Sequence, residues 1–264
     1  PEGNIQIELT EGVVNSVTFK KVTTKRDNER TSERRANLRT KPYVFERSQE
    51  VKPGEIFQAK NVENTIRELY RTGIFTSIEP VMTGSEADPN ARNIEFMVEE
   101  RPTTTINGSI SYGTEVGLVG GVKLSDSNFL GRGQEASLNI EASNSGDKTL
   151  EISFFDPWIK DTERVQGGGS FYWRQITDED AGIDEIERVS RIGTRWTLGK
   201  GLNSNIFVRG ALRFDNYKEY YSGKELGDKY NLLAFSPSLI YDTRDNSFNP
   251  TKGIYTTLRY ETGK

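Results

Sequence analysis

The side chains that usually carry catalytic chemistry are sparse in this sequence. Cysteine and histidine are both absent, which removes thiol nucleophiles, histidine general bases and the usual zinc ligands. The charged residues that invite attention are Asp156, Asp242, Arg244 and Asp245, all in turn-like sequences. Such residues commonly serve turn hydrogen bonds and ion pairs. The residue types therefore exclude metal hydrolases and Ser-His-Asp enzymes. We expect a protein that is not an enzyme and has no metal site and no cofactor.

A glycine-rich segment, Gly131-Arg132-Gly133, is a poor phosphate loop. A phosphate loop leads directly into a helix, whereas this segment lies between two strand patterns, so we interpret it as a turn. The net charge of −4 and the isoelectric point near 5.3 give no case for nucleic-acid binding.

The hydropathy of the chain excludes one membrane class and leaves another open. No stretch approaches the ~20 apolar residues of a membrane-spanning helix. The mean hydropathy is −0.67. A barrel strand needs only about 9–11 residues with every second one apolar, so it leaves no mark on this mean.

The N-terminal part mixes strand and helix patterns. In 60–72, Val62, Ile66 and Leu69 share one helical face, and Gly73 supplies a stop signal. The predicted order is strand, helix, helix, strand, strand, at about 13–22, 44–49, 60–72, 74–78 and 94–98. This order indicates a small α+β domain with both helices on one face of its sheet.

Two further segments belong to this part of the chain. Residues 4–9 alternate apolar and polar residues, which predicts another strand. Residues 20–41 are rich in lysine and arginine, and we interpret them as an exposed loop. Contact of this loop with anionic lipid or an acidic partner is the alternative.

From Thr103 onward the sequence contains only strand patterns. Apolar residues alternate with charged ones along each strand, which predicts one apolar and one polar face. The nine predicted strands are at about 104–114, 117–127, 134–144, 148–156, 164–177, 188–199, 204–217, 231–243 and 253–262.

Alternation alone does not separate a soluble β-sandwich from a membrane barrel. The connections favour the barrel, because compact links alternate with two longer charged links at 177–187 and 217–230. Short turns at one rim and longer loops at the other are typical of outer-membrane barrels. A soluble all-β binding protein is the alternative.

Several motifs resemble one family of barrels. GSISYGTEVG at 108–117 is similar to the first barrel strand of the BamA family, and SNFLGRGQEASL at 127–138 to its next turn and strand. FFDPW at 154–158 and YDTRDNSFNPTKG at 241–253 resemble other turns of the bacterial surface-antigen barrel superfamily. Upstream, VKPGEIF, LYRTGIF and IEFMVEERP resemble the polypeptide-transport-associated (POTRA) domain nearest the barrel.

The resemblance implies a domain plan. Residues 1–12 are expected to be the end of a preceding POTRA unit or a lead-in strand, 13–102 the barrel-proximal POTRA domain, and 103–264 the N-terminal part of an antiparallel transmembrane β-barrel. Family barrels have about sixteen strands. Roughly nine are expected here, so we interpret the chain as a fragment.

The resemblance also implies a function and a location. A BamA-like protein inserts β-barrel proteins into the outer membrane of a diderm bacterium, with its POTRA domains in the periplasm. The implied partners are unfolded β-barrel clients, accessory assembly lipoproteins and outer-membrane lipid. Alternatives with the same layout are a secretion pore of the two-partner or autotransporter type and a TamA-like or organellar translocation channel.

A barrel satisfies its backbone groups by closure, so a weak seam is where a client strand could pair. The first barrel strand is rich in small residues and is expected to pair weakly, although its glycines could simply accommodate curvature. The predicted client edge is Ile106, Gly108, Ser109, Ile110, Ser111, Tyr112 and Gly113. The predicted partner contacts of the POTRA domain are Ile74, Thr76, Ile78 and Val81.

Overall fold

The computed structural model divides by its contacts into two compact units. The first holds Pro1–Thr103 and Leu130–Gly133, and the second holds Thr104–Phe129 and Gln134–Lys264. The strand predicted at 4–9 lies outside the described residues. The structure describes residues 12–22, 24–25, 32–33, 37–85, 90–114, 116–177, 186–203, 205–221, 224–244 and 251–264.

The first unit confirms the predicted order of strand, helix, helix, strand, strand. Its main elements are β1 (Val13–Lys21), α1 (Pro42–Ser48), α2 (Ala59–Arg71), β4 (Phe75–Gly84) and β5 (Ala91–Glu100). In the sheet order β1-β5-β4, β5 is central, with β1 parallel to it and β4 antiparallel.

The basic segment, predicted as a loop, is partly regular. Within it, β2 (Thr24–Lys25) pairs with β3 (Ser32–Glu33). The structure describes no residue between these two strands.

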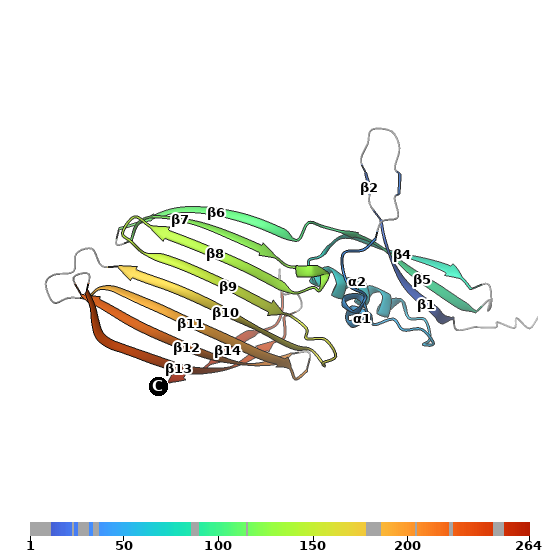
Figure 1. Cartoon of the computed structure of the whole chain (residues 1–264). Helices are drawn as coiled ribbons and strands as arrows, with labels where there is room; N and C mark the ends of the chain where they lie inside the picture. The colour runs from blue at the N-terminus through green and yellow to red at the C-terminus, as the bar shows by residue number, and fades with distance from the viewer. Residues whose placement is uncertain are drawn as a thin grey trace, which may run out of the picture. The chain divides into compact units, whose positions relative to one another are not determined.

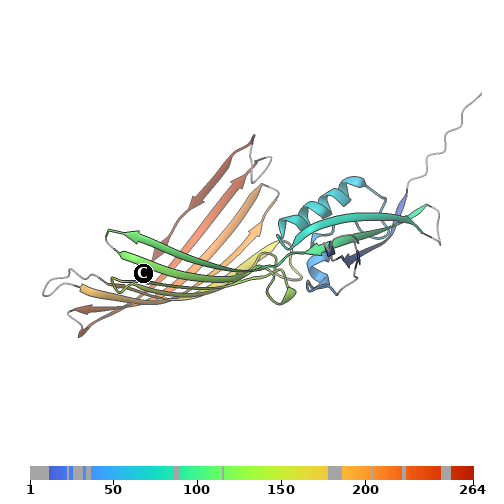
Figure 2. The ribbon, with the colours of Figure 1, turned by 90° about the horizontal axis from the view of Figure 1, so that it is seen from above.

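Figure 2 shows the helices and strands of the first unit from above. The buried side chains of its core come from both helices and from β1, β4 and β5. Successive side chains of a strand point to opposite faces, so β5 turns alternate residues inward. Among these, Phe96 is fully buried, as is Leu69 on α2. The rings of Phe19 and Phe96 stack with centroids 5.1 Å apart. Gly73, with φ of 68°, ends α2 in the left-handed conformation predicted for it.

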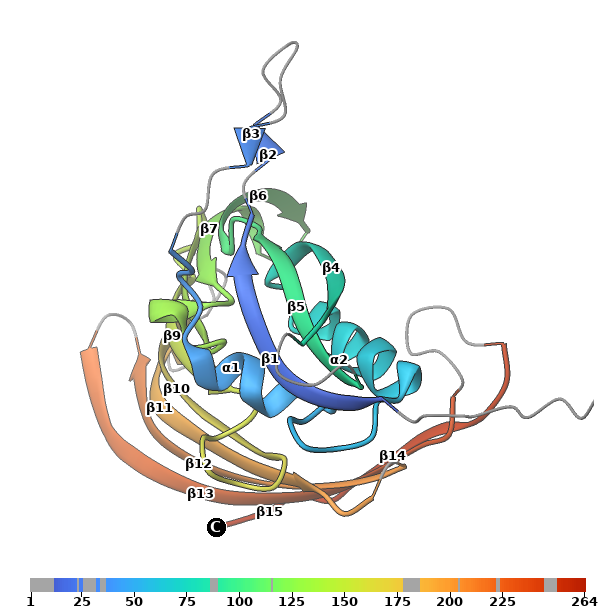
Figure 3. The same cartoon turned by 90° about the vertical axis from the view of Figure 1, so that its right-hand side faces the viewer.

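The second unit is one antiparallel sheet in which neighbours in sequence are neighbours in space (Figure 1). Viewed in Figure 3, the sheet is strongly curved. Its strands are β6 (Thr104–Gly113), β7 (Gly117–Asp126), β8 (Glu135–Ser143), β9 (Lys148–Asp156), β10 (Val165–Thr177), β11 (Ile186–Gly201), β12 (Ile206–Tyr221), β13 (Lys224–Asp242) and β14 (Tyr255–Arg259), with β15 (Thr262–Gly263) also paired to β13.

The nine predicted strands correspond to β6 through β14, with one clear error. The charged stretch 217–230, predicted as a long loop, is mostly strand, because β12 and β13 extend as a hairpin to Tyr221 and Lys224. Cross-strand contacts explain the extension: Tyr217 and Tyr230 stack with ring centroids 4.7 Å apart. Most of the other predicted loop, at 177–187, lies outside the described residues.

The pairing register gives this sheet one apolar and one polar face. One row crosses eight strands and is almost wholly apolar: Ile106, Leu124, Leu138, Ile152, Phe171, Thr194, Phe214 and Leu233. The adjacent row, on the opposite face, is mostly polar: Asn107, Lys123, Asn139, Glu151, Tyr172, Gly193, Asp215 and Leu232.

The apolar face is exposed rather than buried. Ile106 is 74% exposed and Leu233 56%. Of the helices in the described part of the chain, none is long and apolar enough to span a membrane.

Candidate functional site

The first strand of the large sheet, β6, is one of its two ends. Among the described residues, β6 pairs with β7 alone. All seven residues of the predicted client edge lie on β6, so the structure brings them together on one strand. Whether they bind a client remains a prediction.

The direction of the backbone groups divides these residues into two sets. Leu118 of β7 faces β8, because its C=O accepts from the Asn144 N–H at 3.0 Å and its N–H donates to Asn144 Oδ1 at 2.7 Å. Backbone direction alternates along an antiparallel strand, so Val119 faces β6 and its partner Ser111 faces β7.

The same alternation fixes the rest of β6. Ser109, Ser111 and Gly113 direct their N–H and C=O groups into the ladder with β7. The residues that direct theirs to the free edge are Ile106, Gly108, Ile110 and Tyr112. Sequence reasoning proposed all seven residues but could not separate these sets, since the separation depends on register.

The side chains of β6 leave its free edge uncovered. Ile110 is 83% exposed and Tyr112 77%, and both belong to the apolar face. Gly108 has no atom within 4 Å of the place where a Cβ would sit. Ser109 belongs to the polar face, where its hydroxyl lies beside Gly121 of β7.

The small sheet offers two further edges, and neither is fully open. The start of β1 is occupied, because the Val14 N–H donates to Glu55 O at 2.9 Å and Gly54 N–H donates to Val14 O at 2.8 Å. On β4, the outward N–H of Ile78 donates to the Tyr70 hydroxyl at 3.1 Å. Two residues further, Pro80 has no N–H to offer.

The four predicted partner contacts of this domain differ in what they expose. Ile74 and Ile78 are buried in the core, so their side chains are not available to a partner. Their backbones are partly occupied as well, because Ile74 O accepts from the Arg101 N–H at 2.9 Å and the Ile78 N–H donates to Tyr70. Thr76 and Val81 are exposed. The contacts themselves remain predictions.

A carboxylate cluster that sequence reasoning missed holds the end of β5. The Glu100 carboxylate accepts hydrogen bonds from the Thr40 hydroxyl at 2.6 Å, the Thr40 N–H at 2.8 Å and the Arg39 N–H at 3.1 Å, and pairs with Lys21 at 3.1 Å. Burial raises the pKa of Glu100, but these hydrogen bonds outweigh burial, and the pKa lies below its ordinary value. The cluster fixes the segment from which the chain enters β6.

A second missed cluster lies on the polar face of the large sheet. Asp215 of β12 is fully buried; it accepts a short hydrogen bond from the Tyr172 hydroxyl and pairs with Arg191 at 2.7 Å and Arg213 at 3.2 Å. A side chain at Gly193, between Tyr172 and Asp215 in the register, would collide with both. The cluster ties β10, β11 and β12 together.

The turn residues singled out in the sequence serve turn chemistry where the structure describes them. Asp156 Oδ1 accepts from the Trp158 N–H at 3.0 Å. Asp242 pairs with Arg244 at 2.8 Å, while Asp245 lies outside the described residues. Gly131 and Gly133 have positive φ, as the turn interpretation requires. Within the described ranges, no three acidic side chains gather to hold a metal ion.

Two family models match the chain. The POTRA model, described as a surface antigen variable number repeat, matches residues 35–101. The Omp85 superfamily domain matches residues 128–264, which is more than half of the chain.

Relatives agree with these models. The outer membrane protein assembly factor BamA of Neorickettsia risticii is 25% identical over 259 residues, covering 96% of this chain and 33% of that protein. Thus the chain spans about a third of the length of this relative.

Solved structures share the fold at low identity. BamA from Haemophilus ducreyi lacking POTRA domains 1–3 has a TM-score of 0.71 at 17% identity, covering 96% of this chain and 48% of that one. CdiB from Acinetobacter baumannii has a TM-score of 0.67 at 11% identity, covering 96% and 46%. A periplasmic POTRA domain is therefore followed by outer-membrane barrel strands, as the sequence predicted. The chain belongs to the Omp85 superfamily.

Proposed function

We propose that this chain is part of an assembly factor that inserts β-barrel proteins into the outer membrane, and that the free edge of β6 pairs with the incoming client strand. The observation that carries the proposal is the register, which points the backbone groups of Ile106, Gly108, Ile110 and Tyr112 away from β7, toward the seam where the first strand of a barrel meets its last strand. A strand edge that is weakly paired at this seam is a template for β-augmentation. The similarity to BamA of Neorickettsia risticii supports the assembly role.

A secretion pore is the second candidate. Fold alone does not choose between the two, because CdiB matches nearly as well as BamA. In a secretion pore, β6 would stay paired with the last strand of its own barrel, and the cargo would contact only the polar face. A TamA-like or organellar translocation channel is a further alternative with the same layout.

The sharpest test uses the two backbone sets of β6 in the full-length protein. Ile110→Pro removes an N–H from the free edge and leaves the ladder with β7 intact. Ile110→Ala trims the same side chain but keeps the N–H, so it is the matched control. We expect Ile110→Pro to lower client insertion while the protein keeps its heat-modifiable gel mobility, and Ile110→Ala to insert clients normally. Normal insertion by Ile110→Pro would refute the edge mechanism.

Photocrosslinking separates the assembly factor from the pore. A photoreactive residue at Tyr112 reports from the free edge, and one at Ser109 from the polar face. An assembly factor gives crosslinks from Tyr112 to the terminal strand of the client. A pore gives crosslinks from Tyr112 only to the protein's own last strand, and cargo crosslinks only from Ser109.

We also propose that the β4 edge of the POTRA domain receives nascent chain or an accessory lipoprotein. Thr76 and Val81 are exposed along this strand. Photoreactive residues at these two positions, compared with one at Asn61 on α2, test the proposal. Crosslinks from α2 alone would contradict it.

A further inference from the structure

The apolar face of the barrel sheet is not level, because it has a depression over strands β10–β13. One row across β10–β13 reads Gly167, Leu198, Gly210 and Pro237, so two of its four positions have no side chain. The next row toward the middle of the strands contains Gly169. Larger side chains surround these positions, which leaves hollows between them.

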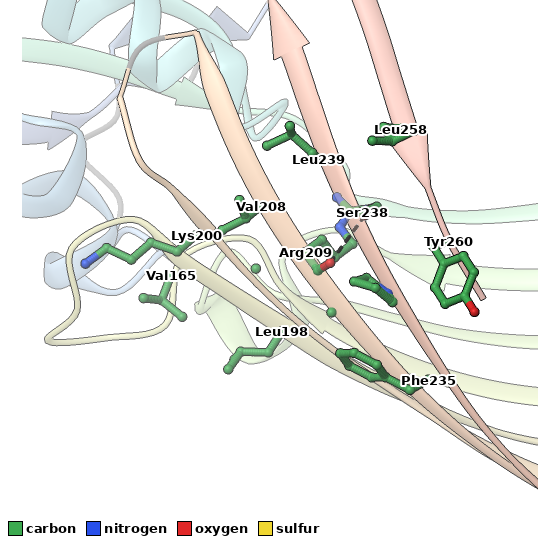
Figure 4. Close-up of a pocket in the computed structure, with 13 residues that line it drawn as sticks. Val165, Leu198, Lys200, Val208, Arg209, Phe235, Ser238, Leu239, Leu258 and Tyr260 are labelled. Atoms are coloured by element: carbon green, nitrogen blue, oxygen red, sulfur yellow. Dashed lines mark hydrogen bonds between the residues drawn. The ribbon is translucent and has the colours of Figure 1, made fainter. Parts of the chain in front are cut away.

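Two adjoining hollows occupy this area. The first has a volume of about 620 Å³ and includes Val208, Leu239 and Leu258 in its lining, as Figure 4 shows. The second has a volume of about 960 Å³ and includes Phe154 and Trp196. They share Leu198, Gly210 and Phe235. Both volumes lie within the range of about 300–1,000 Å³ that is usual for small-molecule sites.

Aromatic rings of neighbouring strands occupy the space that a side chain at these glycines would need. A Cβ at Gly169 would lie 2.9 Å from the Trp196 ring, which leans across the position. A Cβ at Gly210 would lie 3.4 Å from the Phe235 ring. The depression is therefore lined partly by aromatic rings, whose large apolar surface suits contact with a flexible hydrocarbon chain.

One end of the first hollow carries positive charge. Lys200 lies on the same face as Val165 and Val208, to which it is paired in the register, one residue before β11 ends. It also lines a rim cavity of about 560 Å³ together with Trp158 and Arg164. The Lys200 Nζ is 3.6 Å from Glu163 Oε2, in a pair whose carboxylate side chain is 94% exposed. Such an exposed pair contributes little and is readily exchanged for another anion.

The position of this rim identifies the leaflet. The chain enters β6 from the periplasmic domain, and the strands alternate in direction, so the β9–β10 and β11–β12 turns lie at the rim where β6 begins. This rim faces the periplasm. Trp158, beside it, has the amphipathic character of an interfacial residue, and its indole N–H donates to Thr162 O at 2.8 Å.

We propose that this depression binds one glycerophospholipid of the periplasmic leaflet, with its phosphate on Lys200 and Arg164 and an acyl chain in the hollow between β11 and β14. The combination of a cationic rim and an apolar trough fits this class of lipid. The site is independent of the client edge, since it lies at the other end of the strand order.

The test uses the full-length protein in phosphatidylcholine vesicles that contain phosphatidylglycerol with a photoreactive group on one acyl chain. Crosslinked residues are then mapped by mass spectrometry. We expect them to concentrate on β11–β14. Crosslinks spread evenly over the apolar face would overturn the proposal.

Two variants with matched controls sharpen the test. Gly210→Leu fills the hollow, whereas Gly120→Leu adds the same side chain at another glycine of the same face, where the Cβ meets nothing within 4 Å. Lys200→Gln removes the rim charge, whereas Lys148→Gln removes a charge from the same face at the opposite rim. We expect each site variant to lower crosslinking at β11–β14 by roughly two- to fivefold and neither control to change it.

Heat-modifiable mobility shows whether Gly210→Leu still folds, and Lys200→Gln, at an exposed position, tests the site without changing its shape. Unchanged crosslinking in Lys200→Gln would show that no headgroup is held there. Unchanged crosslinking in a folded Gly210→Leu would show that the hollow is not the acyl site.

Discussion

The POTRA domain and the barrel sheet use the same alternation of apolar and polar residues, but the apolar face is buried in the first and exposed in the second. Phe96 on β5 is fully buried, whereas Ile110 on β6 is 83% exposed. In the POTRA domain the apolar face is covered by α1 and α2, while on the barrel sheet it is exposed. Alternation therefore specifies a strand, and only the neighbouring elements decide what its apolar face contacts.

The polar faces of the two sheets also differ in burial, in the opposite sense to the apolar faces. The outer face of β5 in the POTRA sheet carries Glu95, which pairs with Lys20 near water. The polar face of the barrel sheet contains the cluster around the fully buried Asp215. Buried polar contacts thus hold strands together in the barrel sheet, as buried apolar contacts do in the POTRA domain.

The largest expected effect tests the buried side of this comparison. Phe96→Ala deletes a ring from the POTRA core and is expected to destabilise that domain by about 3–5 kcal/mol, through lost burial and a cavity. Hydrogen exchange of the full-length protein should show faster exchange in β1, β4, β5 and α2.

The matched change on the exposed side is Ile110→Ala. Because Ile110 is exposed and belongs to no buried core, we expect protection of the β6–β7 ladder to stay nearly unchanged. Loss of protection in β6 comparable with that caused by Phe96→Ala in β5 would contradict the distinction between the two faces.

The next effect concerns the polar face. Asp215→Ala leaves Arg191 and Arg213 without their shared carboxylate and is expected to cost about 2–4 kcal/mol. The temperature at which the barrel loses its folded gel mobility should fall. Glu151→Ala is the control, since its 3.0 Å pair with Arg174 lies on the same face but is partly exposed. Equal effects of the two changes would show that burial of the cluster contributes nothing.

Sequence reasoning recovered the parts of the fold that depend on local pattern. The helix at 60–72, its stop at Gly73 and the nine barrel strands follow from periodicity and turn residues. It failed at 217–230, where charged residues and tyrosines resembled a loop but pair across a hairpin. Charge indicates contact with water, and the polar face of a barrel strand meets that condition as well as a loop does.

The candidate site was predictable only as a strand. That β6 is an edge follows from its place as the first strand, but which residues face outward depends on a register fixed through Leu118 and Asn144. The clusters around Glu100 and Asp215 join residues 60 and 24 positions apart in the sequence, respectively. Contacts at such separations have no local sequence signal.

A smaller effect should depend on pH. Because the folded pKa of Glu100 is lowered, its stabilisation is present above the unfolded pKa and is lost as the pH falls through the folded pKa. We expect Glu100→Gln to destabilise the POTRA domain at neutral pH by about 1–2 kcal/mol and to have little effect in acid, below the folded pKa. Hydrogen exchange of β5 at both pH values measures the difference. A penalty that does not change with pH would mean that the carboxylate charge is not what stabilises the cluster.

The smallest effect compares the two strand edges directly. Tyr70→Phe removes the hydroxyl that accepts from the Ile78 N–H and should open one position of the β4 edge, which then resembles the free edge of β6. We expect a loss of about 0.5–1.5 kcal/mol, because a single neutral hydrogen bond is removed at a site that water can reach. Exchange should accelerate at Ile78 but not at Val98, its partner on β5, and crosslinking from Val81 to nascent chain should increase. Tyr43→Phe, which removes another hydroxyl of the same unit, is the control. If Tyr70→Phe accelerates exchange at Ile78 but leaves crosslinking from Val81 unchanged, the Tyr70 hydroxyl protects the β4 edge but does not control the binding of nascent chain to it.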